Sequence, residues 1–166
     1  MHIAKRMTAA TLVALSFGAL SPATLATAGG SASCYNYKKA ERQFADKINL
    51  ARRVAGSGSI RLDKQLSKVA RRHAWEMDKE NRLFHTEGNK LGWRVTRWNS
   101  LGENVGVGGS VDSLHKAFMA SPAHRDNVLR ASYSHLGVGV HRDKNYMWVT
   151  MVFESSRDPG TRLRMC

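Results

Sequence analysis

The stretch from Tyr146 to Phe153 limits the fold more than any other part of the sequence. As a strand it is apolar on both faces, with Tyr146, Trp148 and Val152 on one and Met147, Val149, Met151 and Phe153 on the other. Such a strand has to be covered on both sides, here by helices. Leu136, Val138 and Val140 alternate with glycines and predict a preceding strand, joined by a turn at residues 142–145. We therefore expect an α+β fold, a three-layer α-β-α sandwich with a central antiparallel sheet.

Four helices are expected to provide this cover. The first spans about residues 36–54, and its apolar face consists of Tyr37, Ala40, Phe44, Ile48 and Ala51. The second spans about residues 63–81, with Asp63 as its N-cap. Its apolar stripe contains His73, which we expect to be a core residue with one hydrogen bond. The third spans about residues 111–120, and Ser121 followed by Pro122 is the start signal of the fourth.

Residues 83–101 follow neither a helical nor a strand pattern. An irregular segment of this length inside a compact domain is usually functional or lines a cleft. It carries two tryptophans, Trp93 and Trp98. They form either a binding wall or a cover over the core, and the sequence favours neither interpretation.

The first 28 residues have the features of a secretory signal peptide. Lys5 and Arg6 precede a mostly apolar stretch of 14 residues from Met7 to Leu20, and Ala26-Thr27-Ala28 has the form of a cleavage site. The apolar stretch is short for a membrane span, so a retained anchor is the weaker alternative. We expect a leader at residues 29–35, one domain at residues 36–166, and a secreted, extracellular monomer that is not an integral membrane protein.

The two cysteines agree with export. An even number of cysteines in a secreted chain suggests a disulfide, here between Cys34 and Cys166, which would close nearly the whole domain. Two alternatives stay open. Cys34 could carry a lipid, although the leucine that such signals usually have is missing before it, or either cysteine could be free.

The chain is strongly basic, with a formal net charge of +13. For a secreted protein the acidic partners would be envelope polymers, anionic lipid or extracellular nucleic acid. The basic residues are scattered and no aromatic residues alternate with them, so we expect no specific nucleic-acid binding. A solvated surface that keeps the protein soluble is the favoured interpretation.

Three residues carry the chemistry that the sequence offers: His85, Glu103 and His124. Two imidazoles and a carboxylate suit zinc or another divalent metal, or acid–base catalysis. They are 18 and 21 residues apart, so only the tertiary fold can bring them together. The sequence has neither an H-E-x-x-H helix nor a G-x-S-x-G elbow. A purely structural hydrogen-bonded cluster is the competing interpretation.

Several short segments together resemble one known family. They include Asn49-x-x-Arg52, Phe84-His85, Gly102-Glu103-Asn104-Val105, and Ser121-Pro122-Ala123-His124-Arg125-Asp126-Asn127-Val128-Leu129. Their order and spacing resemble the CAP superfamily, the SCP-like domains of cysteine-rich secretory proteins, antigen 5 and pathogenesis-related 1 proteins, in its compact bacterial form. The resemblance covers about residues 48–153.

The resemblance implies an α-β-α sandwich with a large cleft that holds a divalent metal in some members. His85, Glu103 and His124 match the metal positions by segment, and Trp93, Trp98 and Ser121 are expected along the cleft. The second glutamate that relatives often carry is missing: Phe118-Met119-Ala120 stands there. The resemblance favours a non-enzymatic binding module for a lipid, a glycan or an anionic envelope component. The alternatives are a zinc-dependent hydrolase of extracellular or cell-wall peptide, and an interaction protein acting at another cell's surface.

Overall fold

A computed structural model describes residues 35–143 and 145–156. The expected signal peptide, most of the expected leader, and both cysteines lie outside the described residues. Tyr35, at the end of the expected leader, is buried, and its ring lies 4.6 Å from that of Tyr37 and under the guanidinium of Arg71. The ordered packing of the domain therefore includes Tyr35.

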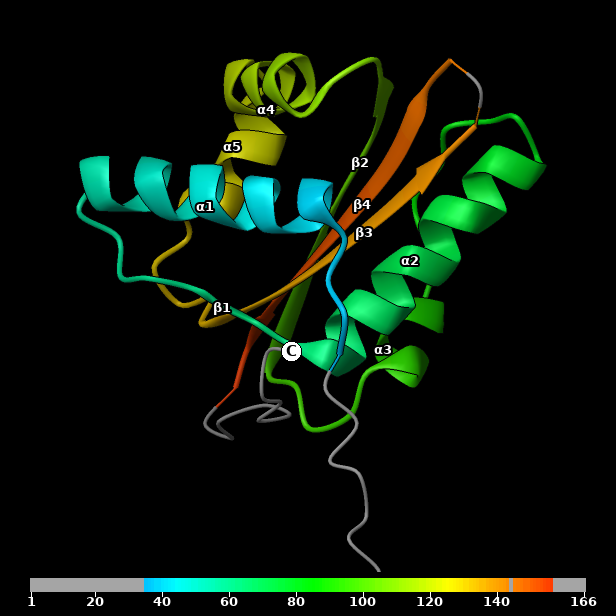
Figure 1. Cartoon of the computed structure of the whole chain (residues 1–166). Helices are drawn as coiled ribbons and strands as arrows, with labels where there is room; N and C mark the ends of the chain where they lie inside the picture. Colours follow the sequence, from blue (N-terminus) through cyan, green and yellow to red (C-terminus); the bar gives the residue numbers. More distant parts are fainter. Residues whose placement is uncertain (1–34, 144, 157–166) are drawn as a thin grey trace, which may run out of the picture. The chain divides into compact units, whose positions relative to one another are not determined.

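A four-stranded sheet forms the centre of the domain (Figure 1). Its strands are β1 (Arg61–Leu62), β2 (Ser100–Gly108), β3 (His135–Arg142) and β4 (Met147–Ser155), in the order β1-β3-β4-β2. The hairpin of β3 and β4 is antiparallel and central, as the sequence predicts, and β2 pairs antiparallel with β4. Only the short β1 departs from the expected antiparallel sheet, because it pairs parallel with β3.

Helices cover both faces of this sheet. In Figure 1, α1 (Lys39–Val54), α4 (Val111–Ala120) and α5 (Pro122–Leu129) lie on one side, and α2 (Lys64–Lys79) and α3 (Lys90–Arg94) on the other. The apolar residues of β4 divide between these sides. Met147, Val149, Met151 and Phe153 join the core under α1, α4 and α5. Trp148 and Val152 pack with residues of α2. The two-faced pattern is thus confirmed, except that Tyr146 precedes β4 and is exposed.

Two glycines of β3 let α2 lie directly on the sheet. A Cβ atom at Gly137 would stand 2.2 Å from the carbonyl carbon of Leu66, and one at Gly139 would stand 2.1 Å from the backbone of Ala70 and Arg71. No side chain larger than hydrogen fits between helix and strand at these two positions. The glycines that alternate with Val138 and Val140 therefore fix the distance between α2 and the sheet.

Two buried charged side chains hold the elements around the site. Glu41, fully buried, accepts a hydrogen bond from the backbone N–H of Lys38 (2.9 Å) and pairs with Arg71 of α2. This contact places the start of α1 at residue 39 rather than 36. Arg52, also fully buried, donates to the carbonyl oxygens of Val128, Arg130 and Tyr133 at 2.9–3.0 Å. Arg52 thereby ties the end of α5 to α1.

The segment at residues 83–101 is more regular than its sequence suggests. It contains the five-residue helix α3, and β2 begins at Ser100. Asp63 caps α2 as predicted, accepting from the N–H of Leu66 at 3.0 Å. Ser121 is the N-cap residue of α5, but its side chain makes no capping hydrogen bond.

Candidate functional site

The site is built around the edge strand β2. Gly102, Asn104 and Gly106 face α4 and α5, since a Cβ at Gly106 would meet Phe118 and the side chain of Asn104 bonds to α5. Glu103 shares the opposite face with Val105, which packs on α2. Because side chains alternate along β2, the carboxylate of Glu103 lies on the side of α2 and the amide of Asn104 lies on the side of α4 and α5.

Glu103 binds the segment that carries His85. The two oxygens of its carboxylate accept from the backbone N–H of Thr86 at 2.8 Å and from the hydroxyl of Thr86 at 2.6 Å. The Nδ1 atom of His85 lies 3.0 Å from Oε1 of the same carboxylate. The Glu103 side chain is only 6% exposed, whereas that of His85 is 58% exposed. An ionised carboxylate can only accept, so Nδ1 of His85 is the donor, and in the neutral ring the lone pair is on Nε2.

A second contact fixes this segment from the side of α2. His73 is buried, and its Nε2 lies 2.8 Å from the carbonyl oxygen of Phe84. The rings of His73 and Phe84 meet edge to face at 5.0 Å. The prediction of a core role for His73 is confirmed, and its contact with Phe84 holds the residue before His85 in place.

His124 is positioned from the other face of β2. Its ring packs edge to face against Phe118 of α4 at 5.3 Å. The Nδ2 atom of Asn104 donates to the carbonyl oxygen of His124 at 2.9 Å, and Nδ2 of Asn127 donates to Oδ1 of Asn104 at 2.8 Å. The asparagine of the Gly-Glu-Asn motif thus fixes the first turn of α5, while the glutamate beside it fixes His85.

His85 acts electrostatically on His124. Burial, and to a smaller extent the positive charge of His85, lower the pKa of His124 from its ordinary value. His124 is therefore neutral at pH 7, the state in which an imidazole binds metal. His85 and Glu103 are in direct contact. His124 is connected to them through the hydrogen bond of Asn104 in β2 and through the electrostatic effect of His85 on its pKa.

The contacts of the three predicted residues bear on whether they could hold a metal. Among residues 35–143 and 145–156, no group of three or more His, Cys, Asp and Glu side chains is arranged to hold an ion. His85 and His124 offer imidazole nitrogens, and in the described residues the ring of His124 makes no hydrogen bond to protein. The oxygens of Glu103 already accept three hydrogen bonds. Metal binding by His85, Glu103 and His124 therefore stays a prediction.

Two cavities lie along the segment at residues 82–101. One, of about 600 Å³, is lined by His85 and Thr86 together with charged side chains of α2 and the following loop, among them Glu76, Arg82 and Arg94. The other, of about 490 Å³, is lined by Trp93 and Trp98. The tryptophans are 78% and 43% exposed, so they do not cover the core. Neither cavity includes Ser121, which is half-buried between α4 and α5.

Sequence reasoning missed the residues that hold the site together. Thr86 directly follows the Phe84-His85 motif and Asn104 lies inside the motif of Glu103, but their partners are 17 and 20 residues away. The motif Asn49-x-x-Arg52 contains Arg52 but does not indicate that its side chain is buried. In the sequence, Thr86 and Asn104 are marked only by being polar residues that can donate a hydrogen bond and that stand next to a candidate histidine or glutamate.

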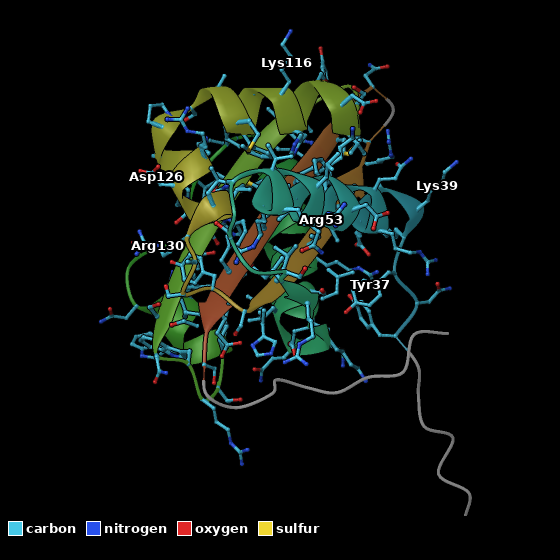
Figure 2. The ribbon with its side chains drawn as sticks, turned by 90° about the vertical axis from the view of Figure 1, so that its left-hand side faces the viewer. Tyr37, Lys39, Arg53, Lys116, Asp126 and Arg130 are labelled. Atoms are coloured by element: carbon cyan, nitrogen blue, oxygen red, sulfur yellow. The ribbon has the colours of Figure 1, made fainter. Side chains whose placement is uncertain are left out.

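The basic residues spread over several elements. Figure 2 shows Lys39 and Arg53 on α1, Lys116 on α4 and Arg130 after α5, all exposed, with the acidic Asp126 on the same face. Elsewhere on α1, Lys47 pairs with Asp112 at 2.5 Å. This distribution agrees with a solvated surface, and a role in binding stays a prediction.

Helices on both faces of the sheet and histidines beside its edge strand define an α+β domain of the SCP type. The model of the cysteine-rich secretory protein family, CAP, matches residues 45–153. The chain belongs to this family, and the resemblance drawn from its motifs is confirmed. It is 29% identical over 123 residues to YkwD of Bacillus subtilis, covering 70% of this chain and 46% of YkwD. The chain thus spans less than half the length of that curated relative.

Solved structures agree with this assignment. An extracellular SCP-domain protein from Bacillus anthracis superposes with a TM-score of 0.63 at 25% identity, over 70% of this chain and 40% of that one. NaASP2, solved with Zn²⁺, has a TM-score of 0.54 at 14% identity, over 70% of this chain and 80% of that one. The second likeness concerns the fold alone.

Proposed function

We propose that the chain is a secreted, non-enzymatic CAP-domain binding module in which His85 and His124 hold a divalent metal. The observation that carries this proposal is the contact of His85 Nδ1 with Glu103, because it leaves Nε2 as the metal-binding atom. A carboxylate behind a ligating histidine is the usual support for such a ligand. Zinc is the first ion to test, and a family neighbour solved with Zn²⁺ supports this choice.

Two imidazoles leave most of the coordination shell open. Once bound, the ion supplies a Lewis-acidic centre for an oxygen of a lipid, glycan or envelope component. His85 and His124 bind and orient this ion, while Thr86 and Glu103 hold His85 in its tautomer. We expect a modest metal affinity that decreases as the pH is lowered, because protons compete with the metal for both imidazole rings.

The contacts of Glu103 favour binding over hydrolysis. A zinc-dependent peptidase needs a general base that can take up a proton beside the metal. Both carboxylate oxygens of Glu103 already accept hydrogen bonds from Thr86 and His85. Glu103 therefore serves better as a support for His85 than as a base.

Two observations support the proposal that the protein is exported. A neighbour in the same family is described as extracellular, and the signal-like first 28 residues agree with export. Within the described residues, no helix combines the length and hydropathy needed to cross a membrane.

A zinc titration tests the proposal. The purified protein is stripped of metal and titrated calorimetrically as wild type, His85→Ala, His124→Ala and His141→Ala. His141 is the matched control, because it is a partly exposed histidine that pairs with Asp78 away from the site. We expect one zinc site that is lost in the first two variants and kept in the control. Equal zinc uptake by all four proteins would refute the site, and zinc-dependent peptide turnover needing both histidines would establish the hydrolase instead.

A further inference from the structure

The cavity of about 490 Å³ beside α3 has an uncharged lining that is rich in aromatic and aliphatic side chains. It consists of Trp93, Trp98, Leu91, Leu101 and Asn89, with the backbone of two glycines. No ionisable side chain contributes to this lining, whereas the cavity at His85 is rich in them. We call this surface the tryptophan groove.

Trp98 is held in place although it is exposed. Its indole N–H donates to the carbonyl oxygen of Gly92 at 3.1 Å. Its ring lies on Gly92 so closely that a Cβ there would stand 2.9 Å from Cζ2 of the indole. Arg97, the preceding residue, has a φ of 60°, a left-handed conformation that is rare outside glycine. Such backbone strain at an exposed position is typical of ligand-binding sites.

The two basic residues of α3, beside the groove, are paired within the protein. Lys90 pairs with Glu87 at 2.7 Å, and Arg94 pairs with Glu76 at 3.0 Å. None of the side chains that line the groove is charged, so the lining itself offers no charge to an anionic polymer or lipid headgroup, despite the chain's net charge of +13. It offers instead two aromatic faces and the side chain of Asn89, whose amide makes no capping bond to α3.

We propose that the tryptophan groove binds a neutral saccharide. A pyranose ring has an apolar C–H face that packs on an indole, and hydroxyl groups at its rim that bond to an amide. The cavity volume lies in the range of small-ligand sites, which are mostly apolar with a few polar groups. This inference goes beyond the metal-dependent binding proposed above, because it concerns a second site whose lining includes neither His85 nor His124.

Titration with soluble oligosaccharides tests the groove. The full secreted protein is studied in a chelator by calorimetry and tryptophan fluorescence, with chitotetraose and cellotetraose as probes. We expect saturable binding that changes little between about 50 mM and 500 mM NaCl, because no ion pair is involved. Trp93→Ala should weaken it about tenfold or more, since an exposed aromatic contact is lost.

Trp75→Ala is the matched control. Trp75 is 46% exposed on α2, close to the exposure of Trp98, and lies outside the groove lining. Binding should survive in this variant and in His85→Ala/His124→Ala, whereas Asn89→Ala should weaken it. Absence of binding by either sugar, or equal loss in Trp75→Ala, overturns the proposal. Binding to phosphatidylcholine–phosphatidylglycerol vesicles that needs Trp93, without sugar binding, overturns it in favour of a membrane surface. Zinc binding without sugar binding rejects the saccharide site in the groove but leaves the metal site at His85 and His124 standing.

Discussion

Substitution of Gly139 by alanine tests how α2 is placed on the sheet. The added Cβ would lie 2.1 Å from backbone atoms of Ala70 and Arg71. Both are main-chain atoms of α2, so no rotamer change can relieve the overlap. The helix has to move outward by about 1.3 Å to bring this distance to the 3.4 Å at which ordinary contact begins.

This displacement has a cost that follows from what α2 buries. Leu66, Ala70, Ala74 and Met77 are fully buried between α2 and the sheet. A gap of about 0.5–1 Å already forfeits a quarter to a half of each dispersion contact across the interface, and this gap is at least as wide. Overpacking usually costs about 1–3 kcal/mol, and a helix-wide shift belongs at the upper end. We expect a loss of about 3 kcal/mol in unfolding free energy and a fall of about 10 °C in Tm.

Denaturant and thermal unfolding followed by circular dichroism measure the effect. Gly109→Ala is the control, because a Cβ there meets nothing within 4 Å. The shift of α2 should also disturb His73 and its contact with Phe84, so zinc affinity should fall together with stability. A Gly139→Ala protein whose stability lies within about 0.5 kcal/mol of wild type would refute the close-packing argument.

Two further outcomes follow from the site and from α4. Glu103→Gln should weaken zinc binding by about 10–100-fold while leaving the zinc stoichiometry unchanged, because it removes support for a ligand rather than a ligand; an unchanged affinity in calorimetry would contradict this role. Burial first, and then the charge of Lys47, lower the pKa of His115. As the pH falls, His115 is therefore protonated at a higher pH in the unfolded chain than in the folded protein. The stability that its neutral, buried ring contributes above about pH 6.5 is lost as the pH decreases further. His115→Leu should reduce the loss of unfolding free energy between pH 7.5 and 5.5, and an unaltered slope would disprove it.

Local patterns predicted most of the helices and the central hairpin. Apolar periodicity and the cap at Asp63 were sufficient for α2, and the two-faced apolar pattern was sufficient for β4. β2 was not predicted as a strand, because Gly102, Glu103 and Asn104 have low strand propensity. Its nine residues are held by pairing with β4, from Ser100 with Ser155 to Gly108 with Met147, which no local pattern contains.

The same limit explains what could be predicted of the site. The motifs named His85, Glu103 and His124 but not which of them touch, because contacts between distant segments depend on the register of β2. A slip of one residue along this strand would exchange the faces of Glu103 and Asn104. The carboxylate would then face α5, and the amide would face the segment of His85. The pairing of β2 with β4 therefore decides which histidine receives a carboxylate partner, and with it which imidazole nitrogen is free for a metal.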